Sequence, residues 1–134
     1  AAFAPQESGL VGLVNTIAPA IVSGNTVVVV ASEDLPLSAI TLAEVLETSD
    51  LPGGVVNILT GSAKELGSWL ASHLDVNAID LEGSDSPAEL ELLSAENLKR
   101  VIRPGVYPRQ GANGSLQHIL DLMEVKTVWH PKGH

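Results

Sequence analysis

The chain of 134 residues contains no cysteine and very few aromatic side chains, with one Phe, one Tyr and two Trp. Without cysteine it forms no disulfide and has no thiol nucleophile, and its redox compartment stays undetermined. Since aromatics make up only 3% of the chain, the core must be built from Val, Leu, Ile and Ala. That composition suits buried parallel strands flanked by helices.

Cationic side chains are also scarce, with seven Lys and Arg against 16 Asp and Glu. The resulting net charge of −9 argues against partners such as nucleic acid or an anionic membrane surface, which would repel the chain. No apolar run reaches the length of about 20 residues that spans a bilayer. Neither a signal peptide nor an initiator Met precedes the first apolar segment, so we expect a piece of a longer protein. The compartment is not determined, and the cytoplasm is our expectation.

Segments of strand length alternate with segments of helical periodicity, which is the pattern of a parallel sheet wrapped by helices. Strands are predicted at residues 2–4, 26–30, 55–59, 78–81 and 98–102. Helices are predicted at residues 10–21, 38–46 and 66–73, in the acidic stretch before the fifth strand, and at residues 116–123. Pro19 should bend or end the first helix early, and Asp34 or Ser38 should cap the second. The predicted fold class is α/β, an open, mostly parallel sheet of about five strands with helices on both faces.

The chain divides into an α/β body at residues 1–102, a loop at residues 103–114 rich in Pro and Gly, and a terminal part at residues 115–134. Residues 125–129 alternate in the manner of an exposed or edge strand, and we expect this strand to protrude from the body. An isolated edge strand with apolar residues is a liability. We therefore expect it to pair with another chain or domain, and a homodimer formed by strand exchange is the natural outcome.

Several isolated His and Trp residues could have a functional role, but the sequence around them does not favour one. His130 and His134 have a spacing that suits a metal site on a helix, but the intervening Pro and Gly disfavour a helix and no third ligand is evident. We therefore predict no metal. Trp69 and Trp129 are expected in the core or at an interface, and His73 is expected to be a partly buried packing residue.

Five stretches in the body resemble the cofactor domain of aldehyde dehydrogenases. Residues 23–33 are similar to the second strand and following loop of that domain, and residues 51–61 to the third strand and its turn. Residues 75–79, 83–84 and 97–101 follow in the family's order, so the resemblance covers residues 1 to about 102. It implies a Rossmann-like, nucleotide-binding fold for this part.

Residues 124–128 resemble the carboxy-terminal strand of the same family, which crosses to a partner subunit and joins its sheet. The family places its catalytic domain between these two parts, and the loop at residues 103–114 stands in its place. Such a shortened copy resembles the second, non-catalytic module of family-16 aldehyde dehydrogenases. The resemblance implies the interface residues Glu124, Val125, Lys126, Thr127, Val128 and Trp129.

The resemblance implies that this chain alone does not oxidise an aldehyde, although its parent protein would be an NAD(P)-dependent aldehyde dehydrogenase. The reaction needs a thiolate nucleophile, a carboxylate base and donors for the oxyanion. The chain has no Cys. Glu7 stands where the family has its oxyanion-stabilising Asn, and residues 102–105 offer no carboxylate for the family's catalytic Glu.

The same resemblance implies a cofactor site that is only partly retained. The vestigial contacts are the residues that match the family's cofactor-binding positions: Ser32, Glu33, Gly61, Gly67, Gly83 and Ser84. The changes that oppose binding are Val30 in place of a ribose-binding Lys, Ala31 in place of Pro, Ala63 in place of Gly, and Glu82 beside the phosphate-contacting pair. No cofactor is therefore expected in this fragment.

Two functions of different classes remain open at this point. The first is a non-catalytic module that serves assembly or scaffolding, paired through its terminal strand with a second copy or with a complete aldehyde dehydrogenase domain. The alternative is a regulatory domain that still binds NAD(P) or an adenine nucleotide, for which Glu33 and Ser84 are the strongest residues.

Overall fold

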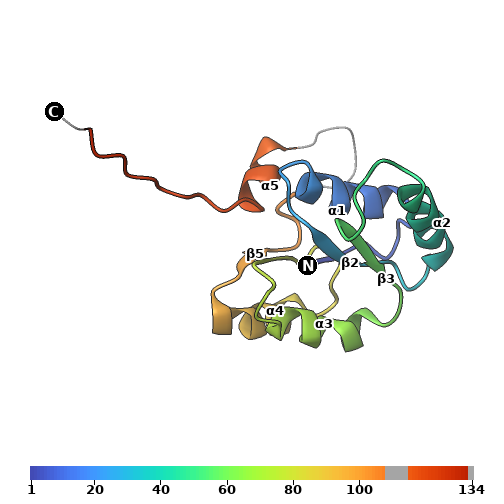
Figure 1. The fold of residues 1–134 in the computed structure, drawn as a ribbon. Coiled ribbons are helices and arrows are strands. Elements are labelled where there is room, and N and C mark those ends of the chain that lie inside the picture. The colour runs from blue at the N-terminus through green and yellow to red at the C-terminus, as the bar shows by residue number, and fades with distance from the viewer. Residues whose placement is uncertain (108–114, 133–134) are drawn as a thin grey trace.

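The computed structural model describes residues 1–107 and 115–132. They form a single parallel sheet with helices packed on both faces (Figure 1). The strands are β1 (Ala2–Phe3), β2 (Val27–Val30), β3 (Val56–Leu59), β4 (Ala78–Asp80) and β5 (Arg100–Ile102). The helices are α1 (Val11–Ile21), α2 (Pro36–Glu47), α3 (Ala63–Ser72), α4 (Pro87–Ser94) and α5 (Leu116–Asp121), with a short 3-10 helix, η1 (Ala95–Asn97), after α4.

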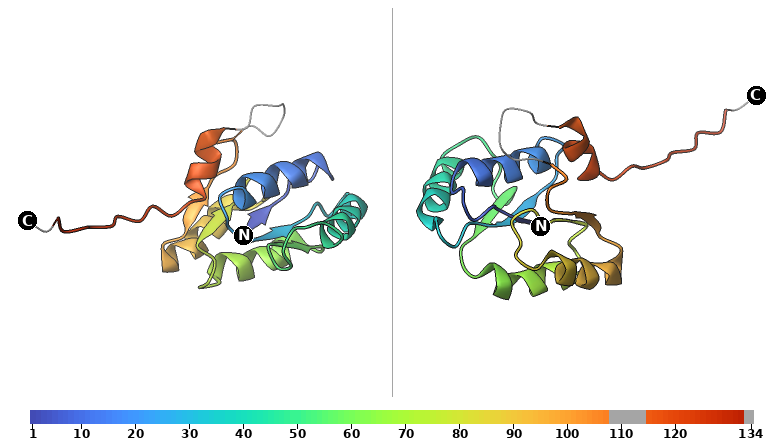
Figure 2. Two further views of the ribbon diagram at one scale, coloured as in Figure 1. Left: turned by 45° about the horizontal axis from the view of Figure 1, so that its top comes forward. Right: turned by 180° about the vertical axis from the view of Figure 1, so that it is seen from behind.

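The strand order across the sheet is β3-β2-β1-β4-β5, and every neighbouring pair is parallel. Helices α1, α2 and α5 cover one face and α3 and α4 cover the other (Figures 1 and 2). The predicted open parallel sheet with helices on both faces is thereby confirmed. The chain runs outward from β1 to β3 and then returns to place β4 on the other side of β1. Ligands of such sheets bind beside this reversal, outside the carboxyl ends of the strands.

The core lies in two layers because the central strands are apolar on both faces. The β2 sequence is four consecutive Val residues, three of which are buried, as expected for a strand covered on both sides. One layer centres on Leu13, Ile17 and Val29 beneath α1, and the other on Phe3, Ile79 and Leu90 above α3 and α4. No helix among the described residues is long and apolar enough to cross a membrane.

Two expectations about helix ends differ from the structure. Pro19 does not end α1 early, since the helix continues to Ile21 and a proline removes only its own N–H donor; a bend at Pro19 stays a prediction. Neither Asp34 nor Ser38 caps α2: its N-cap is Leu35, and Pro36 occupies the first turn, where a missing N–H costs nothing and the fixed φ favours the helix.

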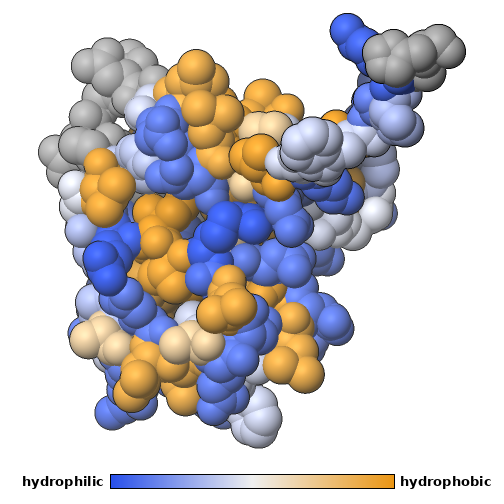
Figure 3. All heavy atoms as spheres, turned by 90° about the vertical axis from the view of Figure 1, so that its left-hand side faces the viewer, coloured by the Kyte–Doolittle hydropathy of each residue, from blue (hydrophilic) through white to orange (hydrophobic). Residues whose placement is uncertain are grey.

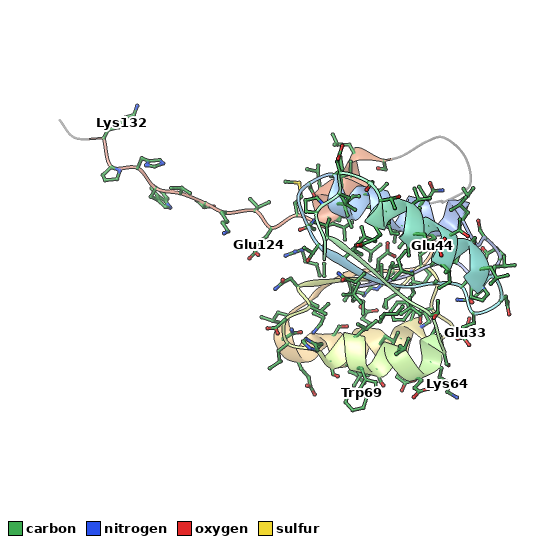
Figure 4. All side chains as sticks on the ribbon, turned by 45° about the vertical axis from the view of Figure 1, so that its right-hand side comes forward. Glu33, Glu44, Lys64, Trp69, Glu124 and Lys132 are labelled. Carbon is green, nitrogen blue, oxygen red and sulfur yellow. The ribbon has the colours of Figure 1, made fainter. Side chains whose placement is uncertain are left out.

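Trp69 and His73 are more exposed than expected. The Trp69 side chain lies on α3 with 73% of its surface exposed, and Figure 4 shows it directed away from the sheet. It is therefore not a core residue, and a role at an interface stays a prediction. His73 follows the last residue of α3 and is exposed, so the expectation of partial burial is wrong because the helix ends before its side chain reaches the sheet.

Beyond α5, residues 124–132 extend away from the body and form no helix or strand (Figures 1 and 2). The strand predicted at residues 125–129 is thus absent from the single chain, because no other strand lies beside it to complete a ladder. Val125 and Trp129 are each 89% exposed. Pairing of this segment with another chain remains a prediction.

Candidate functional site

The carboxyl ends of the strands bring most of the predicted cofactor residues to one edge of the sheet. Ser32 and Glu33 follow β2, Gly61 follows β3, and Gly83 and Ser84 follow β4. Since all the strands are parallel, these loops lie along the same edge, where α/β sheets bind their ligands. Gly67, the sixth predicted residue, lies within α3.

The loops after β1 and β2 are joined by the side chains of Ser32 and Gln6. The buried Ser32 hydroxyl donates a hydrogen bond to the Gln6 carbonyl at 2.7 Å and accepts one from the Leu35 N–H at 3.1 Å. The Gln6 side-chain carbonyl accepts a hydrogen bond from the Glu33 N–H at 2.7 Å. Sequence reasoning missed Gln6, and these contacts give Ser32 a structural role in fixing both loops.

The Glu33 side chain reaches from the end of β2 to the start of α3 (Figure 4). Its Oε1 accepts a hydrogen bond of 2.6 Å from the N–H of Ala63, which is the first residue of α3. The Ser62 hydroxyl, which caps the same helix, accepts from the Glu65 N–H at 3.4 Å. Glu33 therefore acts as a second cap, and its negative charge is favourable beside the positive end of the helix dipole.

Gly61 and Gly83 are required by the backbone itself. Gly61 has φ of +140°, a conformation that other residues rarely adopt. A Cβ at Gly83 would lie 2.2 Å from the Ala4 carbonyl oxygen, so the loop after β4 packs directly on the end of β1. Ser84 is half-buried, and its hydroxyl accepts a hydrogen bond from the Ser86 N–H at 3.2 Å. Each of the three has a structural role that needs no nucleotide.

Gly67 is buried between the two helices that cover one face of the sheet. A Cβ at this position would lie 3.2 Å from both methyl carbons of Leu90 on α4 and 3.6 Å from the Phe3 ring. The glycine thus allows α3 to approach α4 and β1 closely. Its position in the core gives it a packing role, apart from the loops at the carboxyl edge.

The N-terminus of α3 is the natural place on this edge for a pyrophosphate, because free N–H groups and the helix dipole favour anions there. Here Glu33 accepts from the Ala63 N–H and Ser62 accepts from the Glu65 N–H. A pyrophosphate at this helix end would have to displace the Glu33 carboxylate from the Ala63 N–H. The residues present do not fit a dinucleotide held in this way.

The described residues also lack the arrangement needed for aldehyde oxidation. Glu7 is exposed in the loop after β1. Arg103 follows β5, near the place that the resemblance assigns to a catalytic carboxylate, and its guanidinium pairs with Glu91, with 3.0 Å between Nε and Oε2. Hydrogen bonding to Arg103 lowers the pKa of Glu91. Among the described residues no three His, Asp or Glu side chains are grouped to hold a metal ion; His134 lies outside these residues.

A buried polar cluster lies beneath α5, on the face of the sheet opposite to α3 and α4 (Figures 1 and 2). Sequence reasoning missed this cluster. The Asp80 side chain at the end of β4 is 2% exposed, and its Oδ2 lies 3.3 Å from Nε2 of His118 on α5. The His118 ring stacks on Tyr107, with ring centroids 4.5 Å apart. The Tyr107 hydroxyl donates to Asp121, which also accepts from the Gln117 side-chain amide at 2.7 Å.

This cluster attaches α5 and the terminal segment to the body. One local signal was available, because Asp80 interrupts an otherwise apolar buried strand and a buried carboxylate requires a partner. Nothing in the sequence identified His118 as that partner. Asn25 adds a second attachment, since its side-chain amide donates to the Leu122 carbonyl at 3.1 Å.

The parallel sheet, the reversal between β1 and β4, and the loops at the carboxyl edge define a Rossmann-like α/β domain. Residues 1–103 match the model of the aldehyde dehydrogenase family, and the chain belongs to that family. Aldehyde dehydrogenase 1A1 from Homo sapiens is 38% identical over 99 residues, which are 72% of this chain and 20% of that protein. Hydroxyisobutyraldehyde dehydrogenase from Mycolicibacterium austroafricanum is 38% identical over 98 residues, covering 72% of this chain and 19% of that protein.

Solved structures agree with the sequence relatives. An aldehyde dehydrogenase from Bartonella henselae superposes on 75% of this chain and 21% of its own, with a TM-score of 0.69 and 33% identity. A mutant of aldehyde dehydrogenase C from Pseudomonas syringae, in complex with NAD+ and octanal, matches with a TM-score of 0.66 and 34% identity over the same shares of the two chains. The chain thus spans about a fifth of the length of its relatives.

Proposed function

We propose that this chain is a non-catalytic module of a larger NAD(P)-dependent aldehyde dehydrogenase and that it acts in assembly. The observation that carries the proposal is the contact between Glu33 and the Ala63 N–H, 2.6 Å long. This contact turns the residue best suited to hold a ribose into a cap of α3. The lack of any cysteine supports the same proposal, since the family's reaction needs a thiolate.

The terminal segment supplies the surface for assembly. Residues Glu124 to Trp129 are exposed along their whole length, although Val125, Val128 and Trp129 are apolar. Exposed apolar residues on an extended segment are typical of a strand that completes the sheet of another chain. The partner is a second copy or a complete aldehyde dehydrogenase domain.

The cofactor half of the proposal is tested by calorimetric titration of the chain with NAD and with NADP at up to millimolar concentration. We expect no saturable heat and no rise in the melting temperature. The matched variant Glu33→Gln keeps an oxygen acceptor for the Ala63 N–H but removes the charge, and it should only lower stability by about 0.3–1 kcal/mol through the helix dipole. Saturable binding that Glu33→Gln weakens would instead establish the alternative, a regulatory nucleotide-binding domain.

The assembly half is tested by deletion of residues 124–134. Light scattering should show that the deletion converts dimers into monomers. The measured mass should therefore fall by more than the mass of the deleted residues. Circular dichroism serves as the control, since the body is complete without the segment and should remain folded. An unchanged state of association after deletion would refute the role in assembly.

A further inference from the structure

The sheet ends on one side at β3, whose outer backbone groups are available for another strand. The Val27 N–H donates to the Val55 carbonyl at 2.8 Å, and the Ala31 N–H donates to the Leu59 carbonyl at 2.9 Å. Because the groups of successive residues in a strand point to opposite sides, those of Val56 and Ile58 point away from β2. This outer side is a row of donors and acceptors at an edge of the sheet.

A groove with apolar walls lies beside this edge, between β3 and the end of α2. Its volume is about 170 Å³, and its walls include Leu46, Leu51, Val56 and Ile58. A space of this size accepts an aliphatic or aromatic side chain. Glu47 also lines the groove, and the α2 surface beside it carries Glu44 (Figure 4).

The terminal segment has the complementary composition. Over residues 124–134 it carries two cations, Lys126 and Lys132, against one carboxylate, Glu124, whereas the rest of the chain is strongly acidic. If the segment pairs as a strand, Val125, Thr127 and Trp129 share one face. The two apolar members of that face, Val125 and Trp129, match the apolar walls of the groove beside β3.

Charge also distinguishes between the two free edges of the sheet. The β5 edge carries Lys99 and Arg100 at the start of the strand and, after its end, Arg103, which is paired with Glu91. The groove beside β3 is acidic and apolar. A segment with an excess of lysine is attracted to the β3 edge and repelled by the β5 edge.

The segment leaves the molecule instead of folding back on its own body (Figures 1 and 4). Figure 3 shows the face from which it departs, where apolar and hydrophilic residues are interspersed. From these observations we propose that residues 124–129 of a second copy add as a strand to the outer edge of β3, with Val125 and Trp129 in the groove. This inference rests on the proposed role in assembly. It names the β3 edge as the part of the partner that receives the terminal segment.

The lack of native cysteine makes disulfide trapping a clean test of this pairing. One preparation carries Asn57→Cys on β3, a second carries Val128→Cys, and the two are mixed under a mild oxidant. We expect a disulfide-linked dimer of the two variants. The control replaces Asn57→Cys with Arg103→Cys at the β5 edge. Residue 103 is also exposed to solvent, and this variant should give at most a tenth of the linked product.

Two charge-reversal variants test the same β3 edge in the chain that carries no introduced cysteine. Glu47→Lys should raise the dissociation constant of the dimer severalfold, because it places a cation beside the incoming lysines. The matched reversal Glu89→Lys on α4 changes the net charge by the same amount and should leave the dissociation constant unchanged. Trp129→Ala should weaken the dimer by at least tenfold, because it removes the side chain that fills the groove.

The outcomes separate this inference from the proposed function. An unchanged state of association after deletion of residues 124–134 would overturn both. Monomers after deletion, together with trapping at Arg103→Cys and none at Asn57→Cys, would overturn the β3 acceptor alone. A monomeric product in which Asn57→Cys and Val128→Cys of one doubly substituted chain are linked would show that the segment pairs with its own body, and would overturn the second copy as the occupant.

Discussion

Helices α3 and α4 on one face of the sheet and helix α5 on the other are attached by different kinds of contact. On one face α3 and α4 pack through apolar side chains such as Leu90, with Gly67 allowing close approach. On the other face α1 also packs through apolar side chains such as Leu13, but the six-residue helix α5 is attached by the buried pair of Asp80 and His118. The contacts that hold α5 are called the polar face below. A helix as short as α5 buries too little apolar surface to remain docked by the hydrophobic effect alone.

This difference has a functional consequence because the terminal segment begins where α5 ends. The longer helices belong to the cooperative core of the domain, whereas α5 depends on a few polar contacts and is the part most able to undock separately. Assembly through the segment is therefore coupled to the polar cluster and only weakly to the apolar face.

The largest effect on global stability is expected from Leu90→Ala on the apolar face. Leu90 is 4% exposed, and truncation of a buried Leu costs about 2–5 kcal/mol through lost burial and the cavity that remains. Denaturant unfolding should show the loss in a single transition. The control is Leu92→Ala on the same helix, where the side chain is 74% exposed and the change should stay within about 0.5 kcal/mol. Equal losses for the two variants would contradict the packing described here.

A more local effect is expected from His118→Ala on the polar face. Loss of the imidazole removes one hydrogen-bonding partner of the buried Asp80 carboxylate, which costs about 1–3 kcal/mol. The Glu82 N–H remains a partner of Asp80 at 3.1 Å. Since α5 can undock and expose Asp80 to water, the loss of global stability should be smaller than for Leu90→Ala.

Hydrogen exchange distinguishes local undocking from global unfolding. In His118→Ala the amides of α5 should lose their protection while those of β2 and β4 keep theirs. The control is His73→Ala, which changes an exposed histidine and should leave all protection unchanged. Retained protection of α5 in His118→Ala would mean that apolar contacts suffice to dock this helix.

The two faces also differ in how far the sequence predicted them. All five strands and the helices between them were located from periodicity, because each is a local pattern whose apolar residues face a core. The capping of α2 was misjudged at Asp34 and Ser38, since Pro36 fixes the start of the helix without a side-chain cap. Local patterns therefore fixed the elements more securely than their ends.

The polar face depends on contacts that no local pattern reports. Asp80 and His118 are 38 residues apart, and the partner of a buried charge is set by the tertiary fold. Family resemblance likewise selected Glu33 as a ribose ligand but gave no indication that it caps α3. The terminal strand was inferred from a real alternation at residues 125–129, but a strand also needs a neighbour, which one chain does not supply.

Tyr107 offers a finer probe of the polar face because its hydroxyl donates to Asp121 on α5. This hydrogen bond, with burial as a second cause, raises the pKa of Tyr107 from 10.0 to about 12. The folded state thus holds the proton more tightly than the unfolded state. Its contribution to stability is complete below pH 10.0 and is lost as the pH rises toward about 12.

The smallest of the three effects is expected from Tyr107→Phe. At neutral pH the lost hydrogen bond should cost about 1 kcal/mol, and the alkaline decline in stability between pH 10.0 and about 12 should become shallower. As the chain has one Tyr, its ultraviolet titration in the parent chain reports this residue directly. An ordinary titration midpoint in the folded chain would show that the Tyr107–Asp121 bond does not help to hold α5. The polar face would then depend on the Asp80–His118 pair and on the hydrogen bond from Asn25 to the Leu122 carbonyl, and α5 would undock from the body even more readily relative to α3 and α4.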